Sequence, residues 1–266
     1  MLENMRWLAE ATVLAMVRPK ADRQKAAVLT EYSAGWSNIA RHLDNCSNMD
    51  EWLRIKGVED VVQFCNVSGQ LRREAFDWQY FNRNKIFETL RREFPDARSV
   101  TEYGCGVGRN LLFLKQRLPE VNFYGYELCG PGVDLARAAS KKFELHVEYS
   151  QLDYVAGAES DYVFPESDVA FTMYSLEQIP VANRTALENM HRHVGLGSIH
   201  IEPVPENYPY TPRGMLGRLD HWKADYLRDF EKNIASIELA QVKRERLNTA
   251  HNPLMFPTLY VLKKTQ

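Results

Sequence analysis

The second part of the chain alternates short apolar runs with stretches of helical periodicity, and this alternation limits the choice of folds more than any other feature. Repeated strand and helix segments build a parallel sheet, because each helix carries the chain back to start the next strand in the same direction. Only a short connection separates the last two runs, so these two strands are expected to pair antiparallel. The runs cover residues 99–103, 122–126, 145–149, 169–173, 198–201, 237–243 and 254–262.

The sequence therefore predicts a doubly wound α/β fold, with a seven-stranded sheet that is parallel except for its last strand. We expect this domain to cover residues 96–266. The helices that connect the strands are expected at residues 109–118, 132–142, 182–193 and 218–234.

Residues 1–95 carry a different pattern, in which Leu, Met and Val recur at three- and four-residue spacings. This periodicity predicts a helical region with few strand signals. Turn-forming residues gather at 66–69, where a break between helices is expected. The last helix is expected over residues 70–93, because the residue before Pro95 avoids the helical conformation.

The composition is that of an ordinary globular protein, with 45% hydrophobic and 26% charged residues. Lys plus Arg number 33 and Asp plus Glu number 35, so the basic surface typical of nucleic-acid binding is not indicated. The apolar run at residues 11–17 is far shorter than the ~20 residues of a membrane span, and acidic residues precede it. We therefore expect neither a membrane anchor nor a signal peptide.

The cysteines Cys46, Cys65, Cys105 and Cys129 stand apart, without a C-x-x-C pair. This spacing indicates neither a disulfide framework nor a zinc site, and we expect no metal. Reduced thiols are typical of the cytoplasm, which is where we expect this chain. The sequence is compatible with a homo-oligomer.

A glycine-rich turn runs from Glu102 to Asn110, directly after the first strand of the sheet domain and before its first helix. The dinucleotide fingerprint G-x-G-x-x-G would require a third glycine where Arg109 stands, so the turn does not predict an NAD site. Its glycines follow an acidic residue in the spacing E-x-G-x-G-x-G. Glycines at such positions let the backbone approach a ligand that a Cβ would hit.

This turn resembles the first motif of the class I S-adenosylmethionine (SAM)-dependent methyltransferases, E/D-x-G-x-G-x-G. The resemblance extends over residues 96–266 and implies a Rossmann-like methyltransferase fold, an enzyme of methyl transfer and SAM as its cofactor. In that family an acidic residue ends the second strand and binds both ribose hydroxyls, and Glu127 stands at that place. The end of the third strand resembles the family's adenine site, where Asp153 would accept from the exocyclic amine and Leu152 would offer its backbone amide.

The N-terminal segment 78–83 combines aromatic residues with Asn82 and Arg83, and Tyr32 and Trp36 lie further upstream. Aromatic residues of helices usually belong to a core. A lid over a cofactor would use the same residue types to exclude water, and we expect this segment to close over the cofactor. Arg83 or Asn82 would then meet the cofactor's carboxylate.

Glu102 would face the sulfonium side of this site or accept from the ammonium group of the cofactor. The predicted cofactor-binding residues are Glu102, Tyr103, Gly104, Cys105, Gly106, Asn110, Glu127, Leu128, Leu152, Asp153, Met173, Tyr80 and Arg83.

The acceptor side is expected beyond the carboxyl ends of the strands, where ligands of open α/β sheets bind. Tyr174 and Glu177 follow the fourth predicted strand of the sheet, and His200 and Glu202 stand at the end of the fifth. The two carboxylates would hold a cationic amine or guanidinium, or one would take its proton. For a hydroxyl acceptor, His200 or Glu202 would serve as the base. The alternative for each carboxylate is a solvated side chain or a helix cap.

The segment from Thr172 to Pro180 lacks the N/D-P-P-Y/F motif with which many methyltransferases position nucleic-acid bases or glutamine. Together with the balanced charge, this favours a small-molecule acceptor. The carboxylates favour nitrogen over oxygen as the acceptor atom and are compatible with a cationic acceptor. Two alternatives stay open: a protein or RNA methyltransferase, which a large complementary surface would reveal, and a binding protein without catalysis, against which the intact motif residues argue.

Overall fold

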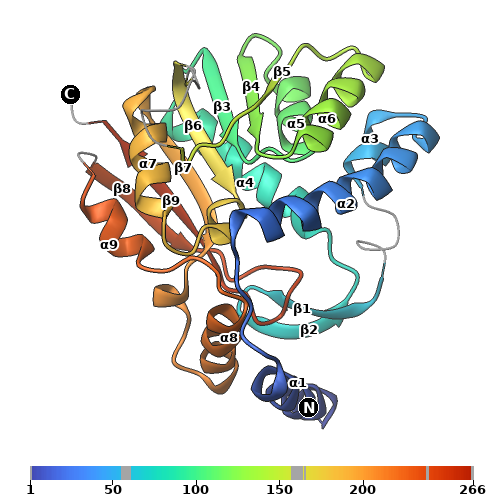
Figure 1. The fold of residues 1–266 in the computed structure, drawn as a ribbon, viewed down its shortest axis with the longest axis vertical. Coiled ribbons are helices and arrows are strands. Elements are labelled where there is room, and N and C mark those ends of the chain that lie inside the picture. Colours follow the sequence, from blue (N-terminus) through green and yellow to red (C-terminus); the bar gives the residue numbers. More distant parts are fainter. Residues whose placement is uncertain (1, 55–60, 157–163, 165, 238–239, 265–266) are drawn as a thin grey trace.

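The structure is a computed structural model that describes the chain except residues 1, 55–60, 157–163, 165, 238–239 and 265–266. A central sheet is flanked by helices, and the N-terminal helices lie beyond one end of its strands (Figure 1). The described part of the chain holds no helix long and apolar enough to cross a membrane.

The central sheet has seven strands in the order β5-β4-β3-β6-β7-β9-β8. Neighbours from β5 to β7 pair parallel, whereas β9 pairs antiparallel with both β7 and β8. The predicted topology is therefore confirmed, including the antiparallel pairing of the last two strands. The strands are β3 (Ser99–Tyr103), β4 (Asn122–Glu127), β5 (Glu148–Gln151), β6 (Ser167–Met173), β7 (Val194–Pro203), β8 (Ala240–Arg246) and β9 (Pro257–Lys263).

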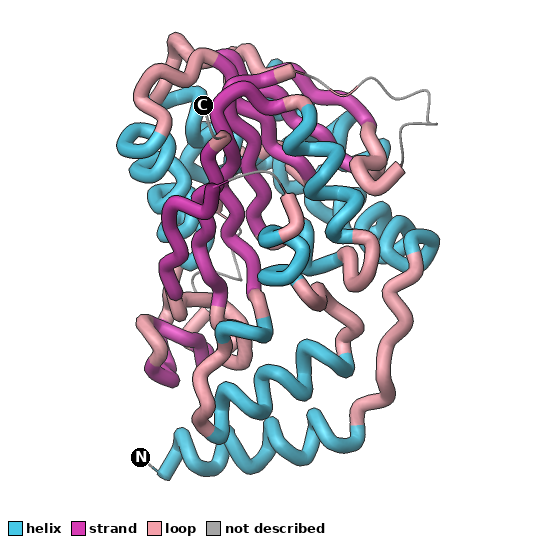
Figure 2. Tube along the Cα trace, turned by 90° about the vertical axis from the view of Figure 1, so that its left-hand side faces the viewer, coloured by secondary structure: helices cyan, strands magenta, loops and turns pink. Residues whose placement is uncertain are grey.

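Both faces of the sheet are covered by helices (Figure 2). Successive residues of a strand point to opposite faces, so Leu259 and Val261 of β9 join the core beneath α4, α5 and α6. Tyr260 and Leu262 join the other core, beneath α7 and α9. Burial on both sides explains why the strands are continuous apolar runs. The helices of this part are α4 (Trp78–Glu93), α5 (Arg109–Arg117), α6 (Gly130–Lys142), α7 (Asn183–Arg192), α8 (Pro212–Lys223) and α9 (Phe230–Ala235), with short 3-10 turns η1 (Leu176–Gln178) and η2 (Pro205–Asn207).

The prediction of one helix over residues 70–93 is wrong in its first part. Strands β1 (Gln63–Val67) and β2 (Gln70–Glu74) form a hairpin instead, and α4 begins only at Trp78. Ser68 and Gly69 both have positive φ, the conformation of a tight two-residue hairpin turn. The hairpin is stabilised from far along the chain, because Asn66 and Ala250 exchange two backbone hydrogen bonds of 2.9 and 2.8 Å.

Several other boundaries also differ from the sequence prediction, and β5, for example, is Glu148–Gln151 and not residues 145–149. The helix expected over residues 218–234 is divided into α8 and α9, because Asp225 and Asp229 adopt positive φ and interrupt it. Residues 238 and 239 of the strand predicted over 237–243 lie outside the described residues, and β8 begins at Ala240.

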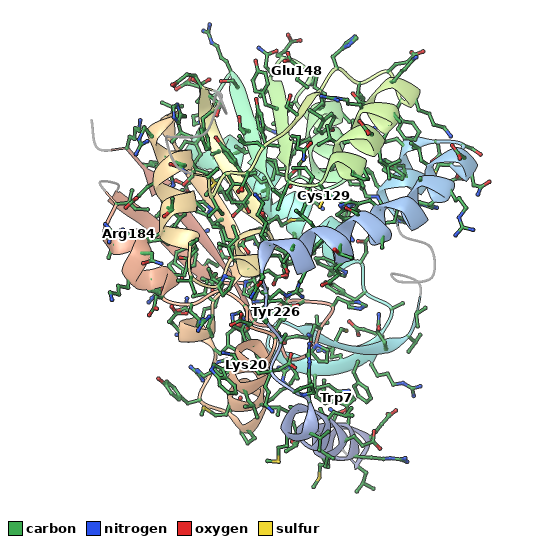
Figure 3. The ribbon with its side chains drawn as sticks, viewed as in Figure 1. Trp7, Lys20, Cys129, Glu148, Arg184 and Tyr226 are labelled. Carbon is green, nitrogen blue, oxygen red and sulfur yellow. The ribbon has the colours of Figure 1, made fainter. Side chains whose placement is uncertain are left out.

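The N-terminal helices α1 (Leu2–Val17), α2 (Lys25–Asn45) and α3 (Met49–Leu53) contact several parts of the sheet domain. Helix α1 packs against α8, and α2 packs against α6. Between them, Ala21 N donates to Lys223 O over 2.7 Å and Arg23 Nη2 donates to the Tyr226 hydroxyl over 3.2 Å. Figure 3 shows Cys129 beside α2 and Tyr226 below the N-terminal end of that helix.

A chain of hydrogen bonds crosses the core between β6, β7 and α7. His200 Nδ1 lies 2.9 Å from Thr172 Oγ1, and His200 Nε2 lies 2.9 Å from Ser198 Oγ. Ser198 Oγ in turn lies 2.7 Å from His191 Nε2. Burial lowers the pKa of both imidazoles, that of His191 to about 4. The chain therefore joins neutral rings and hydroxyls, which can each donate and accept.

We expect the free energy of unfolding of His191→Gln to fall less in acid than that of the wild type. A histidine whose folded-state pKa lies below its ordinary value of 6.5 contributes stability that is present above that value and is lost as the pH falls toward about 4. In urea unfolding, the free energy of the wild type should drop more than that of His191→Gln over this range, by up to ~3 kcal/mol. His146→Gln, at an exposed position, is the control. Equal drops in wild type and His191→Gln would contradict the prediction.

Candidate active site

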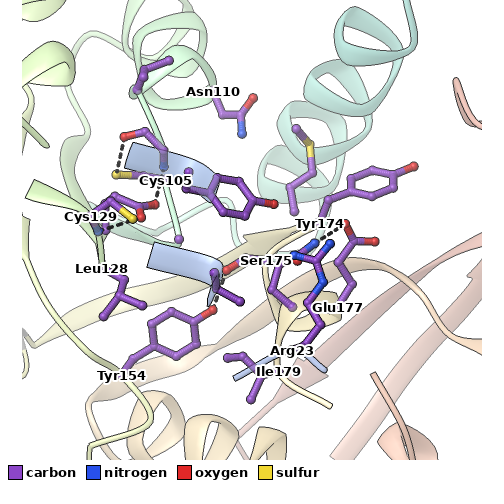
Figure 4. A pocket seen from close by; sticks show the side chains of 18 of the residues that line it. Arg23, Cys105, Asn110, Leu128, Cys129, Tyr154, Tyr174, Ser175, Glu177 and Ile179 are labelled. Carbon is purple, nitrogen blue, oxygen red and sulfur yellow. Dashed lines mark hydrogen bonds between the residues drawn. The ribbon is translucent and has the colours of Figure 1, made fainter. Parts of the chain in front are cut away.

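A cavity of about 700 Å³ lies between the carboxyl ends of β3, β4 and β6 and the helix α2 (Figure 4). Its size falls in the range of about 300–1,000 Å³ that small-molecule sites occupy. Its position agrees with the expectation that ligands bind beyond the strand ends. The lining comes from the glycine-rich turn, the ends of β4 and β6, the N-terminal region and the residues 250–255 before β9.

The glycine-rich turn forms one wall of the cavity. Gly104 and Gly106 have φ values of 73° and 54°, in the left-handed region that favours glycine. A Cβ on Gly104 would lie 1.8 Å from Ser175 Oγ, so the loop after β6 packs directly on the backbone here. Cys105 also lines this wall.

Glu127 ends β4 and holds its carboxylate at the edge of the cavity. One oxygen accepts from Gly106 N and the other from Cys129 N, each over 2.9 Å. These bonds tie the glycine-rich turn to the start of α6. Burial raises the pKa of Glu127, while the two backbone N–H groups act against this shift. The carboxylate is thus oriented before any ligand arrives.

The two residues predicted to bind adenine lie in different places, one at the cavity and one in the core. Asp153 lines the cavity and forms an ion pair of 2.5 Å with Lys25 at the start of α2. Leu128 also lines the cavity. Leu152 is buried, and its backbone amide donates to Glu127 O over 3.0 Å instead of facing the cavity.

A buried polar chain supports the glycine-rich turn from α4. Arg83 Nε donates to Asn110 Oδ1 over 3.1 Å, and Asn110 Nδ2 donates to Glu102 Oε1 over 2.6 Å. Arg83 and Asn110 line the cavity, whereas the fully buried Glu102 stands behind them. Burial raises the pKa of Glu102 to about 8. The predicted contact of Glu102 with the cofactor would therefore pass through Asn110.

Two predicted cofactor residues lie away from the cavity. Tyr103 is fully buried in the core beneath α7, with its ring near those of Tyr126 and Tyr154. Tyr80 is half exposed on the outer side of α4, where its ring packs edge-on against Phe113. The structure thus brings Trp78, Gln79 and Arg83 of the predicted lid segment to the cavity, but not Tyr80. Met173, at the end of β6, does line it.

Glu177 and Tyr174 form the opposite end of the cavity, after β6. Glu177 Oε1 accepts from Gln178 Nε2 over 2.8 Å, whereas its Oε2 is buried and has no hydrogen-bond partner among the described residues. Burial and the nearby Glu202 raise the pKa of Glu177 to about 8. Tyr174 has a φ of 54°, a strained value for a tyrosine, and its ring stands edge-on to Trp78 at 5.2 Å.

Glu202 and His200 lie outside the cavity, in contrast to the sequence prediction. Glu202 is buried and accepts the backbone N–H groups of Ser175, Leu176 and Glu177 over 3.1, 3.1 and 3.2 Å. It therefore fixes the loop that presents Glu177. His200 is buried in the hydrogen-bonded chain between β6 and β7.

Helix α2 forms the cover of the cavity, a role that the sequence prediction gave to the N-terminal region 1–95 and especially to residues 78–83, with Tyr32 and Trp36 named beside them. Val28, Tyr32, Trp36 and Ile39 line the cavity. Their spacing of four, four and three residues is the signal that would have identified one helix face. Arg23, just before α2, also lines the cavity and carried no comparable signal.

No group of three or more His, Cys, Asp or Glu side chains among the described residues is placed to hold a metal ion.

Residues 100–197 match the family model described as a methyltransferase domain. No curated protein sequence matches the chain. Among solved structures, magnesium protoporphyrin IX methyltransferase from Synechocystis PCC 6803 superposes with a TM-score of 0.63 at 11% identity, over 91% of this chain and 100% of that one. Geranyl diphosphate C-methyltransferase from Streptomyces coelicolor A3(2) gives a TM-score of 0.58 at 11% identity, over 86% and 97%.

Residues 100–197 thus resemble a methyltransferase domain, and the predicted Rossmann-like methyltransferase fold is confirmed. The residues that line the cavity fit SAM, independently of these similarities. Gly104 and Gly106 line the cavity without side chains of their own, and Glu127 presents an oriented carboxylate as an acceptor for hydroxyl groups.

We expect Glu127→Ala to weaken cofactor binding by roughly 1.5–3 kcal/mol, the range for hydrogen bonds to a charged group. Titration calorimetry with S-adenosylhomocysteine measures this, and thermal unfolding checks that the variant is folded. Glu148→Ala, an exposed carboxylate on β5, is the matched control. Unchanged affinity in a folded Glu127→Ala variant would remove Glu127 from the cofactor site.

Proposed function

We propose that this enzyme transfers the methyl group of SAM to a small-molecule acceptor, with nitrogen preferred over oxygen. Residues 96–266 form the cofactor domain in this proposal, and residues 1–95 supply the lid and part of the acceptor pocket. The acceptor lies at the end of the cavity formed by Tyr174 and Glu177, and Glu127 marks the cofactor end.

The carboxylate of Glu177 is the observation that carries this proposal. It is buried in a largely apolar wall, and its Oε2 has no hydrogen-bond partner among the described residues. A buried carboxylate is costly unless a cation or a hydrogen-bond donor offsets its desolvation. An ammonium or protonated amine at this end of the cavity would provide both.

The charge of Arg23 lowers the pKa of Glu177, but Arg23 makes no hydrogen bond to Glu177 Oε2. Arg23 donates to Glu31 over 3.0 Å and to the Tyr226 hydroxyl over 3.2 Å, so its charge is already offset by another carboxylate. Aromatic rings of Tyr32, Trp78 and Tyr174 line the same region. Their π faces attract cations, which favours an amine over a neutral hydroxyl.

The small-molecule class is supported by the size of the cavity and by the fold relatives. One relative is named for magnesium protoporphyrin IX and the other for geranyl diphosphate, both small molecules. Their low identity carries over only this broad class. The net charge of -2 does not favour a nucleic-acid acceptor.

The residues at the acceptor end can perform what methyl transfer to an amine requires. Bound SAM supplies an electrophilic methyl group with a good leaving group. Glu177 takes the ammonium proton onto Oε2, which frees the nitrogen lone pair for in-line attack. Tyr174 and Trp78 exclude water and limit the orientation of the acceptor, and Glu202 holds the loop that carries Glu177.

Incubation of the enzyme with methyl-labelled SAM and a metabolite extract tests the acceptor class. We expect the label in an amine of low molecular weight, identified by mass spectrometry. Label only in oxygen-methylated products would contradict the preference for nitrogen. Label only in added protein or RNA would contradict the small-molecule class.

With that acceptor in hand, Glu177→Gln should lower kcat by about 10²–10⁴, the usual contribution of a positioned proton acceptor, and leave SAM affinity unchanged. The wild-type kcat should fall as the pH drops below about 8, because Glu177 becomes protonated. The variant should lack this dependence. Glu188→Gln, on the outer part of α7, is the matched control.

Stability gives an independent check of the same carboxyl group. A raised folded-state pKa contributes stability that is fully present below the ordinary value of 4.5 and is lost as the pH rises through about 8. The free energy of unfolding should therefore fall less for Glu177→Gln than for wild type between about pH 5 and pH 9. Equal decreases in the free energy of unfolding of the two proteins would contradict a raised folded-state pKa of Glu177.

A further inference from the structure

Trp36 of α2 lies where the two loops of the predicted cofactor site meet. A Cβ on Gly106 would lie 3.2 Å from Cζ2 and Cη2 of the indole, and a Cβ on Gly132 would lie 3.1 Å from its Cδ1 and Nε1. The same Cβ on Gly132 would lie 3.1 Å from Glu127 Cγ. The edge of the indole that carries the N–H therefore spans from α6 to the glycine-rich turn, next to Glu127.

The indole N–H of Trp36 is buried and has no hydrogen-bond partner among the described residues. A buried donor left without an acceptor costs free energy, so native proteins rarely retain one without a reason. Trp36 lines the cavity, and the ring of Tyr32, one turn earlier on α2, lies 5.6 Å from it. Trp36 thus lies between the cavity and the core beneath α4, α5 and α6, against which it also packs.

Helix α2 is held against the sheet domain on both sides of Trp36. At its start, Lys25 pairs with Asp153 over 2.5 Å. Near its end, Lys142 Nζ of α6 donates to Leu43 O over 2.6 Å. These contacts fix the indole over the site, although α2 lies outside the residues 100–197 that match the family model.

We propose that Trp36 is a cofactor-binding residue, whose indole N–H donates to an oxygen of the bound nucleoside beside Glu127 and whose ring covers it. The inference rests on the proposed function, because it takes Glu127 as the ribose-binding residue. Because Gly132 lies close to both Glu127 Cγ and the indole Nε1, a nucleoside held by the Glu127 carboxylate would lie beside the indole N–H. The N-terminal region therefore completes the cofactor site as well as the acceptor pocket.

Binding of two nucleosides to the full-length protein tests this role. S-adenosylhomocysteine carries the amino-acid part, and 5′-methylthioadenosine lacks it but keeps the ribose and the adenine. Trp36→Phe keeps a ring and removes the N–H, so it should weaken both ligands by the same factor, roughly threefold to tenfold for one hydrogen bond. Trp36→Ala should weaken both further. Trp222→Phe, a half-exposed tryptophan on α8, is the matched control and should bind as wild type does.

Tryptophan fluorescence supplies a second readout. Nucleoside binding should change the emission of the wild type and of Trp222→Phe, and this change should shrink in Trp36→Phe. Urea unfolding of each variant separates a loss of affinity from a loss of stability.

Four results would overturn the inference. They are wild-type affinity of Trp36→Phe for both nucleosides, a loss confined to S-adenosylhomocysteine, tighter binding by Trp36→Ala, and a fluorescence change in Trp36→Phe equal to that of the wild type. Tighter binding would mean that the indole blocks the site. Failure of the wild type to bind S-adenosylhomocysteine would overturn the proposed function itself, and this inference with it.

Discussion

Several backbone N–H groups just beyond the carboxyl ends of β3, β4 and β6 donate to buried side chains and not to a neighbouring strand. Two buried carboxylates accept them. Glu127 binds the N–H groups of Gly106 and Cys129, and Glu202 binds those of the loop after β6. Each carboxylate joins elements that are distant in the sequence. The shape of the cavity depends on these bonds, because they set the positions of the glycine-rich turn and of Glu177.

The number of hydrogen-bond donors on each buried carboxylate indicates its role. Glu202 has three N–H donors, and Glu127 has one on each oxygen. Among the described residues, Glu177 has only the side-chain amide of Gln178, which donates to one of its oxygens. A carboxylate that is satisfied by the backbone is a structural acceptor, whereas one that is buried with an open oxygen is ready to take a proton or a cation.

Much of the fold could be predicted from the sequence, and the structure places two of the four predicted acceptor-side residues, Tyr174 and Glu177, at the cavity. Glu127 and the glycine-rich turn could be identified because their signals are short motifs, which depend on residues that are close together in the sequence. The end of β7 could not be predicted from such local signals, because it depends on pairing with a distant strand. The apolar run suggested an end at residue 201, but pairing with β9 extends the strand to Pro203, so His200 and Glu202 lie within the sheet and not beyond it. The β1–β2 hairpin likewise depends on a partner at Ala250, which local periodicity cannot reveal.

The end of the cavity at Glu177 is completed by chain segments outside residues 100–197. Trp78 belongs to the N-terminal region, and residues 250–255 precede the last strand. The same N-terminal region reaches the glycine-rich turn, because Arg83 Nε donates to Asn110 Oδ1. An exchange of that region in evolution would therefore alter the wall beside the glycine-rich turn together with the pocket beside Glu177, so the two ends of the cavity would change together.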